Sequence, residues 1–190
     1  MKVGLEGKVK VIVEKDGKIL KKHEQKMNSF LRNFDHLLAL AFAVLRYTST
    51  PAVTLVDRNG VSDELYGLYR YPASDDYPPH IGIGEGTTPV SPDDYDLATP
   101  IERDIVITGF TYDSANRTIT VKGTWTNNTG ATKIIREVGL YVHPTFYSSS
   151  NGGIYYRWFM IIRDLLDTPV DVPDGACVTV EFTITVKVSG

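Results

Sequence analysis

Glycines and acidic residues concentrate in residues 81–101, the stretch where phosphate or metal chemistry would first be sought. Gly82, Gly84 and Gly86 form a G-x-G-x-G pattern, which in dinucleotide-binding proteins follows a strand and opens a helix. The next residues, Thr-Thr-Pro-Val-Ser-Pro, cannot open a helix at once, and the Gly-Lys-Ser/Thr of a Walker loop is absent. The pattern therefore does not indicate a phosphate site.

Three carboxylates of this stretch, Asp93, Asp94 and Asp96, could bind a cation. Calcium prefers several carboxylates together with carbonyl oxygens. The spacing is not that of an EF-hand, and no glutamate closes the loop as a bidentate ligand. We expect Asp93 to cap one helical turn after Pro92 and expect no cofactor. Calcium at the three carboxylates is the alternative.

The other reactive residues do not form a recognisable catalytic pattern. The four histidines are scattered without zinc-ligand spacing, Cys177 is a single cysteine placed where a strand should begin, and no G-x-S-x-G elbow occurs. The acidic loops could supply the two carboxylates of a glycosidase, but no spacing singles out a pair. We therefore expect a protein that is not an enzyme.

Composition and charge bear on whether the chain binds nucleic acid or membrane. The chain has 190 residues with 20 basic and 23 acidic side chains, a formal charge of −3. It offers no basic field for nucleic acid. The longest apolar run, Leu37–Leu45, is far shorter than the roughly 20 residues that span a bilayer. Charges interrupt the N-terminus too often for a signal peptide. We expect one domain, residues 1–190, made in the cytoplasm and binding neither nucleic acid nor membrane.

Two elements precede the glycine-rich stretch. Residues 7–25 alternate apolar and polar side chains on both sides of Asp16-Gly17, which predicts a β-hairpin within an N-terminal segment of residues 1–25. Residues 28–46 change to spacings of three and four, which predicts one amphipathic helix. Its apolar face includes Phe34 and Phe42, and we expect it to cover a sheet or to lie between subunits.

Strands dominate residues 81–189. One run contains Ile105, Ile107, Phe110 and Tyr112, and the last strand alternates so regularly that Val180, Phe182, Ile184 and Val186 should be buried. Five strands at intervals of about 12–18 residues, separated by turns, favour a β-sandwich. The expected fold class is mainly β: a two-layer antiparallel β-sandwich, jelly-roll-like or Ig-like, with one amphipathic helix and an N-terminal β-hairpin.

The order of motifs resembles a group of virion structural proteins, associated with tails, turrets or capsids, in tailed phages and in viruses of thermophilic archaea. The resemblance covers most of residues 25–189. It is carried by a loop with the spacing G-x-G-x-x-T-x-P, an N-x-T-G turn and an E-x-G-L-Y strand. The matching residues are Gly82, Gly84, Thr87, Pro89, Asp93 or Asp94, Leu97, Pro100, Ile101, Trp125 (where Phe would be usual), Asn127, Thr129, Gly130, Glu137, Gly139, Leu140 and Tyr141.

These motifs are structural, and they imply architecture rather than a reaction. We expect residues 81–101 to cross from one sheet to the other, with Leu97 in the core and Pro100 starting a strand. The resemblance implies a non-enzymatic subunit of a virion, in a capsid, turret, tail or fibre, that binds itself and other virion proteins. The alternative is an extracellular filament subunit or a carbohydrate-binding adhesin module.

The hairpin and a tyrosine-proline loop are the expected contacts of a homo-oligomer. A lone hairpin is marginal in water, and a free strand edge can pair with a neighbour. The loop from Tyr66 to His80 has four tyrosines and three prolines before residue 80. The expected interface residues are Val9, Val11, Val13, Phe34, Phe42, Tyr66, Tyr69, Tyr71 and Tyr77.

Overall fold

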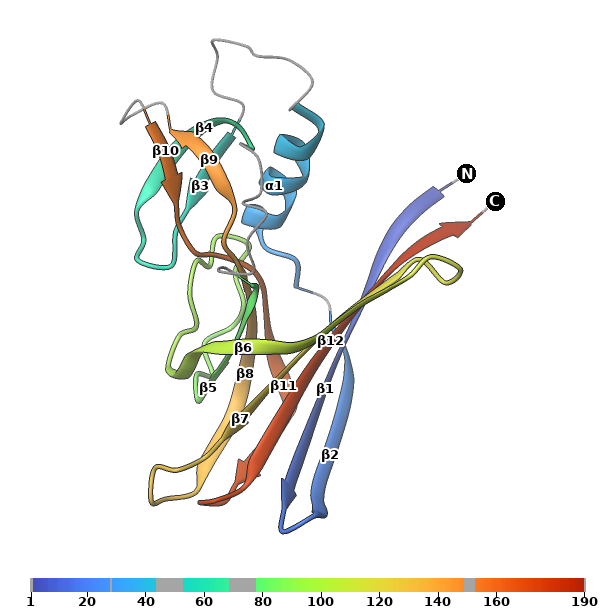
Figure 1. The fold of residues 1–190 in the computed structure, drawn as a ribbon, viewed down its shortest axis with the longest axis vertical. Helices are drawn as coiled ribbons and strands as arrows, with labels where there is room; N and C mark the ends of the chain where they lie inside the picture. The colour runs from blue at the N-terminus through green and yellow to red at the C-terminus, as the bar shows by residue number, and fades with distance from the viewer. Residues whose placement is uncertain (1, 28, 44–52, 69–77, 149–152, 190) are drawn as a thin grey trace.

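The computed structural model describes residues 2–27, 29–43, 53–68, 78–148 and 153–189 (Figure 1). In these residues the chain forms one helix, α1 (Arg32–Ala43), and strands that account for most of the fold. The strands are β1 (Lys2–Lys15), β2 (Lys18–Met27), β3 (Val53–Val56), β4 (Ser62–Leu68), β5 (His80–Gly84), β6 (Pro100–Asp113), β7 (Thr118–Thr126), β8 (Lys133–Val142), β9 (Thr145–Ser148), β10 (Gly153–Tyr156), β11 (Phe159–Val172) and β12 (Cys177–Ser189).

The strands form an eight-stranded sheet in the order β11-β8-β5-β6-β7-β12-β1-β2 and a four-stranded sheet in the order β10-β9-β4-β3. Their pairings are antiparallel. The mainly β, antiparallel prediction is confirmed. The large sheet is nearly closed into a barrel-like shape, and two separate sandwich layers are not confirmed.

Side chains join the two edges of the large sheet. Gln25 on β2 donates to the carbonyl of Leu165 on β11 at 2.8 Å and accepts from the amide of Asp167 at 2.8 Å. Lys21 Nζ donates to the carbonyl of Pro169 at 2.7 Å. The halves of the curled sheet therefore face each other around one core, which contains Val11 and Phe182 from one half and Ile135 and Val170 from the other.

The N-terminal hairpin is part of this sheet. Its turn is confirmed, because Asp16 and Gly17 have φ values of 52° and 72°, as a tight hairpin turn requires. However, β1 pairs with β12 from Lys2 to Glu14, so the hairpin does not stand apart. Val9, Val11 and Val13 are wholly buried in the core, and their assignment to an interface is wrong. Their alternation fills the subunit's own interior.

The last strand has the predicted inner face over most of its length. Val180 and Phe182 are wholly buried and Ile184 is 9% exposed, but Val186 is 37% exposed, so its predicted burial is wrong. The reason is geometric: the end of β12 extends past the core together with the start of β1. Alternation predicts which side of a sheet a residue faces, but it does not predict where the core ends.

The helix begins later than predicted and packs against β3, β4 and β11. Leu31, just before it, is wholly buried, and Phe34 is half-buried against the main core. Phe34 therefore contributes to the subunit's own packing. The side chains of the other predicted interface residues, Phe42, Tyr66, Tyr69, Tyr71 and Tyr77, lie outside the described residues. No helix in the described part is long and apolar enough to cross a membrane.

Candidate assembly surface

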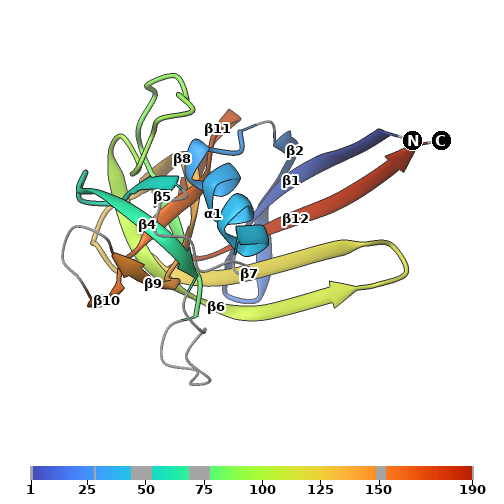
Figure 2. The same ribbon diagram turned by 90° about the horizontal axis from the view of Figure 1, so that it is seen from above.

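Ends of β1, β6, β7 and β12 project from the body of the molecule on the side where both termini lie (Figures 1 and 2). We call this projection the arm, and define it as residues 2–6 of β1, 107–113 of β6, 118–120 of β7 and 184–189 of β12. The strands remain paired in the arm: Tyr112 lies opposite Ile119, and Leu5 lies opposite Val186. The arm is thus a small sheet that continues the large one beyond its core.

A β-bulge sets which side chains the arm presents. In β6 the register shifts between Ile107 and Gly109, so that Thr108 is an extra residue. Such a bulge moves the following residues to the other face of the strand. Phe110 is then opposite Val121, which is opposite the buried Phe182. Phe110 and Tyr112 therefore lie on the core side of the sheet, in line with the interior.

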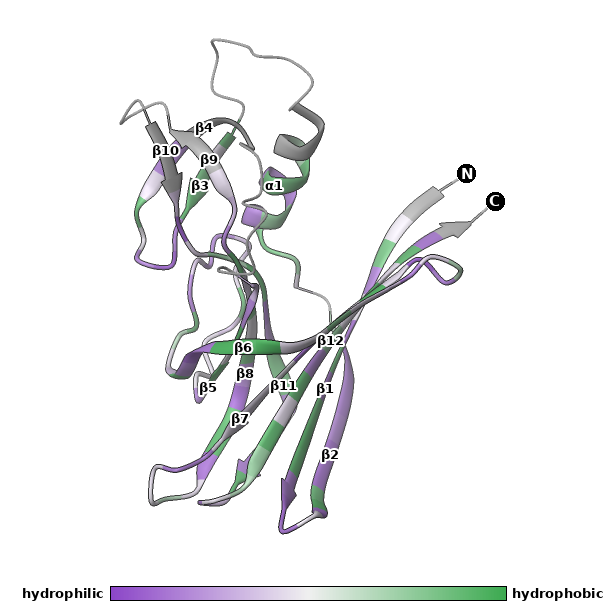
Figure 3. Ribbon diagram, viewed as in Figure 1, coloured by the Kyte–Doolittle hydropathy of each residue, from purple (hydrophilic) through white to green (hydrophobic). Residues whose placement is uncertain are grey.

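The core side of the arm is apolar and exposed. Phe110 is 58% exposed, Tyr112 63%, Leu5 40% and Val186 37%, and Ile119 between them is half-buried. We call these five residues the arm face. Figure 3 shows hydrophobic positions continuing along β1 and β12 toward the two termini. Exposed apolar residues grouped on one face are typical of an interaction site.

The opposite side of the arm is polar. Lys187 Nζ lies 3.4 Å from Glu6 Oε2, and the hydroxyls of Thr118 and Thr185 are 3.1 Å apart. An antiparallel sheet with one solvated face normally packs its other face on a core. In the described residues the arm face lacks such a cover, although its pattern is that of a half-buried sheet.

Both edges of the arm are open in the described part of the chain. β5 pairs with β6 only up to Val106, and β2 pairs with β1 only from Gly7 onward. Residues 107–113 and 2–6 therefore have a strand on one side and backbone groups facing outward on the other. Unpaired N–H and C=O groups on an edge are a template for adding another strand.

The glycine-rich stretch lies at the other end of β6. The prediction that it crosses between sheets is wrong, since β5 and β6 are neighbours in the same sheet, and residues 85–99 form a long loop between them. The predictions that Leu97 is buried and that Pro100 begins a strand are confirmed. We call residues 85–99 the β5–β6 loop.

A buried ion pair organises this loop. Glu137 of β8 is wholly buried, and its carboxylate accepts from the amides of Gly86 at 3.1 Å, Ala98 at 3.0 Å and Thr99 at 2.7 Å. Arg163 of β11 is 1% exposed and lies 2.8 Å from the same carboxylate. Buried charges are stable only when paired and hydrogen-bonded, and here both conditions are met.

Arg163 also bonds the β5–β6 loop directly. Its Nη1 lies 2.6 Å from Asp94 Oδ2 and its Nη2 donates to the carbonyl of Thr88 at 3.0 Å. Burial alone would lower the pKa of Arg163, but the hydrogen bonds to Asp94 and Glu137 outweigh burial and raise it. The guanidinium therefore stays charged, and both members of the ion pair, Glu137 and Arg163, bond the loop.

The glycines are required by close packing rather than by a ligand. A Cβ on Gly84 would lie 2.5 Å from Glu137 Oε1, and one on Gly82 would lie 2.8 Å from the Tyr141 ring. Tyr141 is wholly buried and donates to Asp96 at 2.6 Å. The G-x-G and E-x-G-L-Y motifs, far apart in sequence, thus meet at one place.

The N-x-T-G turn is a second structural motif. Asn127 is wholly buried and its amide donates to the carbonyls of Ala131 and Val172, each at 2.8 Å. Gly130 has a φ of 78°, and its N–H donates to Asp174 at 2.8 Å. The turn is therefore fastened to the predicted Pro-Asp-Gly turn before β12.

The three calcium candidates have different cationic partners. Asp93 pairs with Arg32 at 2.5 Å, Asp94 with Arg163, and Asp96 with Arg103 at 2.6 Å. Among the described residues, no cluster of three or more His, Cys, Asp or Glu side chains could hold a metal ion. Calcium at this loop stays an untested alternative.

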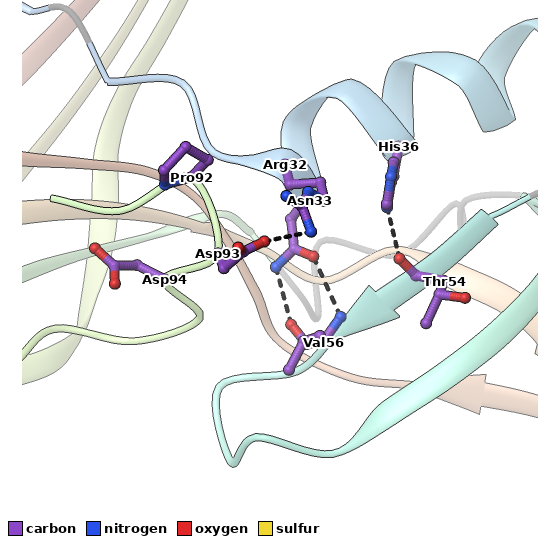
Figure 4. Close-up of a pocket in the computed structure, with 8 residues that line it drawn as sticks. All are labelled: Arg32, Asn33, His36, Thr54, Val56, Pro92, Asp93 and Asp94. Atoms are coloured by element: carbon purple, nitrogen blue, oxygen red, sulfur yellow. Dashed lines mark hydrogen bonds and ion pairs between the residues drawn. The ribbon is translucent and has the colours of Figure 1, made fainter.

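A small cavity of about 150 Å³ lies where the loop meets the start of α1 (Figure 4). Asn33 on its wall donates to the carbonyl of Val56 at 2.9 Å, and His36 lies 2.5 Å from the carbonyl of Thr54. Figure 4 shows Asp93 turned toward Arg32 and Asp94 turned away from it. These polar groups connect the helix to β3 and to the loop. We therefore interpret the cavity as a packing gap between these three segments.

Sequence reasoning missed one further cluster, formed where the two sheets meet. The ring of Trp158 stacks on His80 with centroids 4.0 Å apart and contacts His143 at 4.6 Å. Arg58 lies 5.6 Å from the Trp158 ring and 2.5 Å from Asp104, which also bonds His80 at 3.1 Å. The residues come from separate segments and share no motif, so their sequence carries no signal of the cluster.

Burial sets the protonation of this cluster. Desolvation lowers the pKa of His80 more than its hydrogen bond to Asp104 raises it. Desolvation also lowers the pKa of His143, more than a backbone hydrogen bond raises it. Burial opposes ionisation of Asp104, but the hydrogen bonds from Arg58 and His80 outweigh it and lower its pKa.

Comparison with known proteins adds no relative: no protein-family model, curated protein or solved structure matches the chain.

Proposed function

We propose that the chain is a non-enzymatic structural subunit of a virus particle, part of a capsid, turret, tail or fibre, that assembles with copies of itself and with other virion proteins. The observation that carries this proposal is the arm face. Phe110 and Tyr112 are each more than half exposed on a paired sheet whose edges are open in the described residues. Exposure of an apolar surface to water is unfavourable in free energy, and contact with a neighbouring subunit would remove that surface from water.

The polar clusters support a structural role. Arg163 forms ion pairs with both Glu137 and Asp94, and the backbone of the β5–β6 loop donates to Glu137. These charges are therefore paired inside the subunit. The G-x-G and E-x-G-L-Y residues, which carry part of the resemblance to virion proteins, meet at this loop. The motifs therefore specify how the subunit is built, and the proposal requires no cofactor.

The layering belongs to the same proposal. The two halves of the curled sheet pack on one core, which we interpret as the facing layers of a jelly-roll-like or Ig-like sandwich whose edges are joined by Gln25 and Lys21. The arm then continues one of these layers outward, where a neighbour can reach it.

The test measures mass and shape. Multi-angle light scattering of the full chain over a range of concentrations, with electron microscopy of the same samples, should show oligomers, rings or tubes. The variant F110S/Y112S should shift the mass toward the monomer, because it removes the two most exposed aromatics of the arm face. The matched control is T111S/T120S on the polar side of the same strands, which should assemble as the parent does.

A parent chain that stays monomeric at every concentration, with no particles in the microscope, would overturn the proposal. Binding of that monomer to a glycan panel would favour the adhesin alternative. Assembly that F110S/Y112S leaves unchanged would show that the arm face is not the contact, and the observation that carries the proposal would be lost.

A further inference from the structure

The β6 edge of the arm is self-complementary in shape and pattern. Residues 107–113 have β7 on one side and no strand of the described chain on the other. Their sequence is Ile-Thr-Gly-Phe-Thr-Tyr-Asp, in which Asp113 is the one charged residue. A strand of this composition can lie beside a copy of itself without placing like charges opposite each other.

We propose that two copies of the chain join through this edge, β6 against β6 in antiparallel orientation, with the two-fold axis at Thr111. This inference rests on the proposed function and names the contact by which subunits pair. The joint makes one continuous sheet from two arms, in which the added main-chain hydrogen bonds supply affinity and the aromatic side chains supply register.

The bulge decides the register. An axis at Thr111 pairs residues 109–113 of each copy, so that Phe110 faces the partner's Tyr112 and Gly109 faces the partner's Asp113. An axis at Phe110 would instead place Tyr112 opposite the partner's Thr108, the extra residue of the bulge, where pairing is disrupted. The register at Thr111 keeps the bulge outside the joint and puts both aromatic pairs on the arm face.

The absence of charge favours a second copy as the occupant, and the small apolar area limits the strength of the joint. The arm face has no charged member, which gives an acidic or basic partner nothing to recognise. Phe110 and Tyr112 together expose on the order of 200–250 Å² per subunit, since a large aromatic side chain offers about 150–250 Å². The joint therefore falls below the roughly 1,200 Å² of a standard interface. It should form reversibly in an isolated pair and become stable when repeated in an assembly.

A cysteine placed on the axis tests the register. Thr111 is exposed and lies on the polar side of β6, so T111C in a C177S background, which removes the native thiol, leaves the arm face intact. Residues directly opposite in an antiparallel pair are about 4.5–5.5 Å apart at Cα, within the range a disulfide spans. The matched control is T120C in the same background, because Thr120 is opposite Thr111 on the interior strand β7.

Under mild oxidation, T111C should form a disulfide-linked dimer at least about ten times faster than T120C does. A reducing agent should separate this dimer. Adding F110S to T111C should slow that reaction several-fold. Equal rates for T111C and T120C would mean random collision and would overturn the proposal.

A cysteine at a third position separates the two-fold joint from a head-to-tail one. Gly4 lies on the other open edge, and a Cβ there meets nothing within 4 Å, so G4C should fold normally. If T111C links to G4C and not to itself, the β6 edge joins the β1 edge of the next copy and the two-fold joint is wrong. If the chain assembles but T111C does not link at all, the joint is wrong and the proposed function stands. If the chain is monomeric, both fail.

Discussion

Glu137 and Arg163 are at most 1% exposed in the body of the molecule, whereas Phe110 and Tyr112 are 58% and 63% exposed on the arm. Each pair is placed against the usual preference, since charges avoid the interior and large aromatic residues avoid water. The difference lies in their partners. The buried charges find hydrogen bonds within the chain, while the exposed aromatics find no cover in the described residues.

The comparison separates what builds the subunit from what the subunit can bind. In the body, the ion pair and the β5–β6 loop satisfy each other, which leaves little for a ligand to engage. On the arm, the same sheet continues with its apolar side open. Changes in the body should therefore alter folding, and changes on the arm should alter association.

Glu137 offers the largest test of this difference. E137A leaves the amides of Gly86, Ala98 and Thr99 without their acceptor and deprives Arg163 of one of its two carboxylates. Breaking a buried pair by removing one partner costs about 3–5 kcal/mol. We expect a loss of that size in urea unfolding, or failure to fold. The exposed pair of Lys187 and Glu6 is the control, and K187A should cost less than about 1 kcal/mol.

A loss below about 1 kcal/mol for E137A would contradict the assignment. It would mean that the loop is held mainly by other contacts, such as the burial of Leu97.

Phe182 and Phe110 allow a comparison within one face of one sheet. Both lie on the core side, separated by Val121, but Phe182 is wholly buried and Phe110 is exposed. F182A should cost about 3–5 kcal/mol in unfolding free energy, as large-to-small core changes do. F110A should cost less than about 1 kcal/mol in the monomer and should lower the oligomer mass in light scattering. Similar unfolding costs for the two variants would show that the arm face is covered within the subunit.

Several of these features have a signal in the sequence. The spacing of Ile105, Ile107, Phe110 and Tyr112 is two, three and two, and the extra residue in the middle is what a bulge inserts into an alternating strand. Glu137 and Arg163 have no comparable signal, because each stands beside another charged residue of its strand, Arg136 and Asp164 respectively. The hairpin, the Asp16-Gly17 turn and the inner face of β12 follow from alternation and turn chemistry and are confirmed.

Other features depend on strand order, which local pattern does not determine. Glu137 meets Arg163 because β8 lies between β5 and β11, and the hairpin belongs to the sheet because β1 lies beside β12. Val9 was expected at an interface because an isolated hairpin needs a partner, but the C-terminal strand is that partner. The cluster around Trp158 joins five segments and depends on the same long-range arrangement.

The smallest expected effect is a pH dependence that belongs to the body. Burial lowers the pKa of His80 and His143 below 6.5, so between that lowered pKa and about 6.5 the unfolded chain binds protons that the folded chain does not. The free energy of unfolding should therefore be fully retained above about pH 6.5 and decrease as the pH falls through this window. Asp164, whose pKa burial raises, acts in the opposite direction.

Urea midpoints at about pH 7.5 and about pH 5.5 measure this dependence, and the double variant H80Q/H143Q should have a smaller difference between them than the parent. The comparison uses the slope with pH, so a constant cost of the substitutions does not affect it. D164N is the matched control, because it changes a buried group of the body and leaves the two histidines in place; it should be at least as acid-sensitive as the parent, since it removes a group that acts in the opposite direction. An unchanged slope in H80Q/H143Q would place the acid-sensitive groups elsewhere. A loss of oligomer mass at acid pH without any change in the urea midpoint would place them at the contacts between subunits.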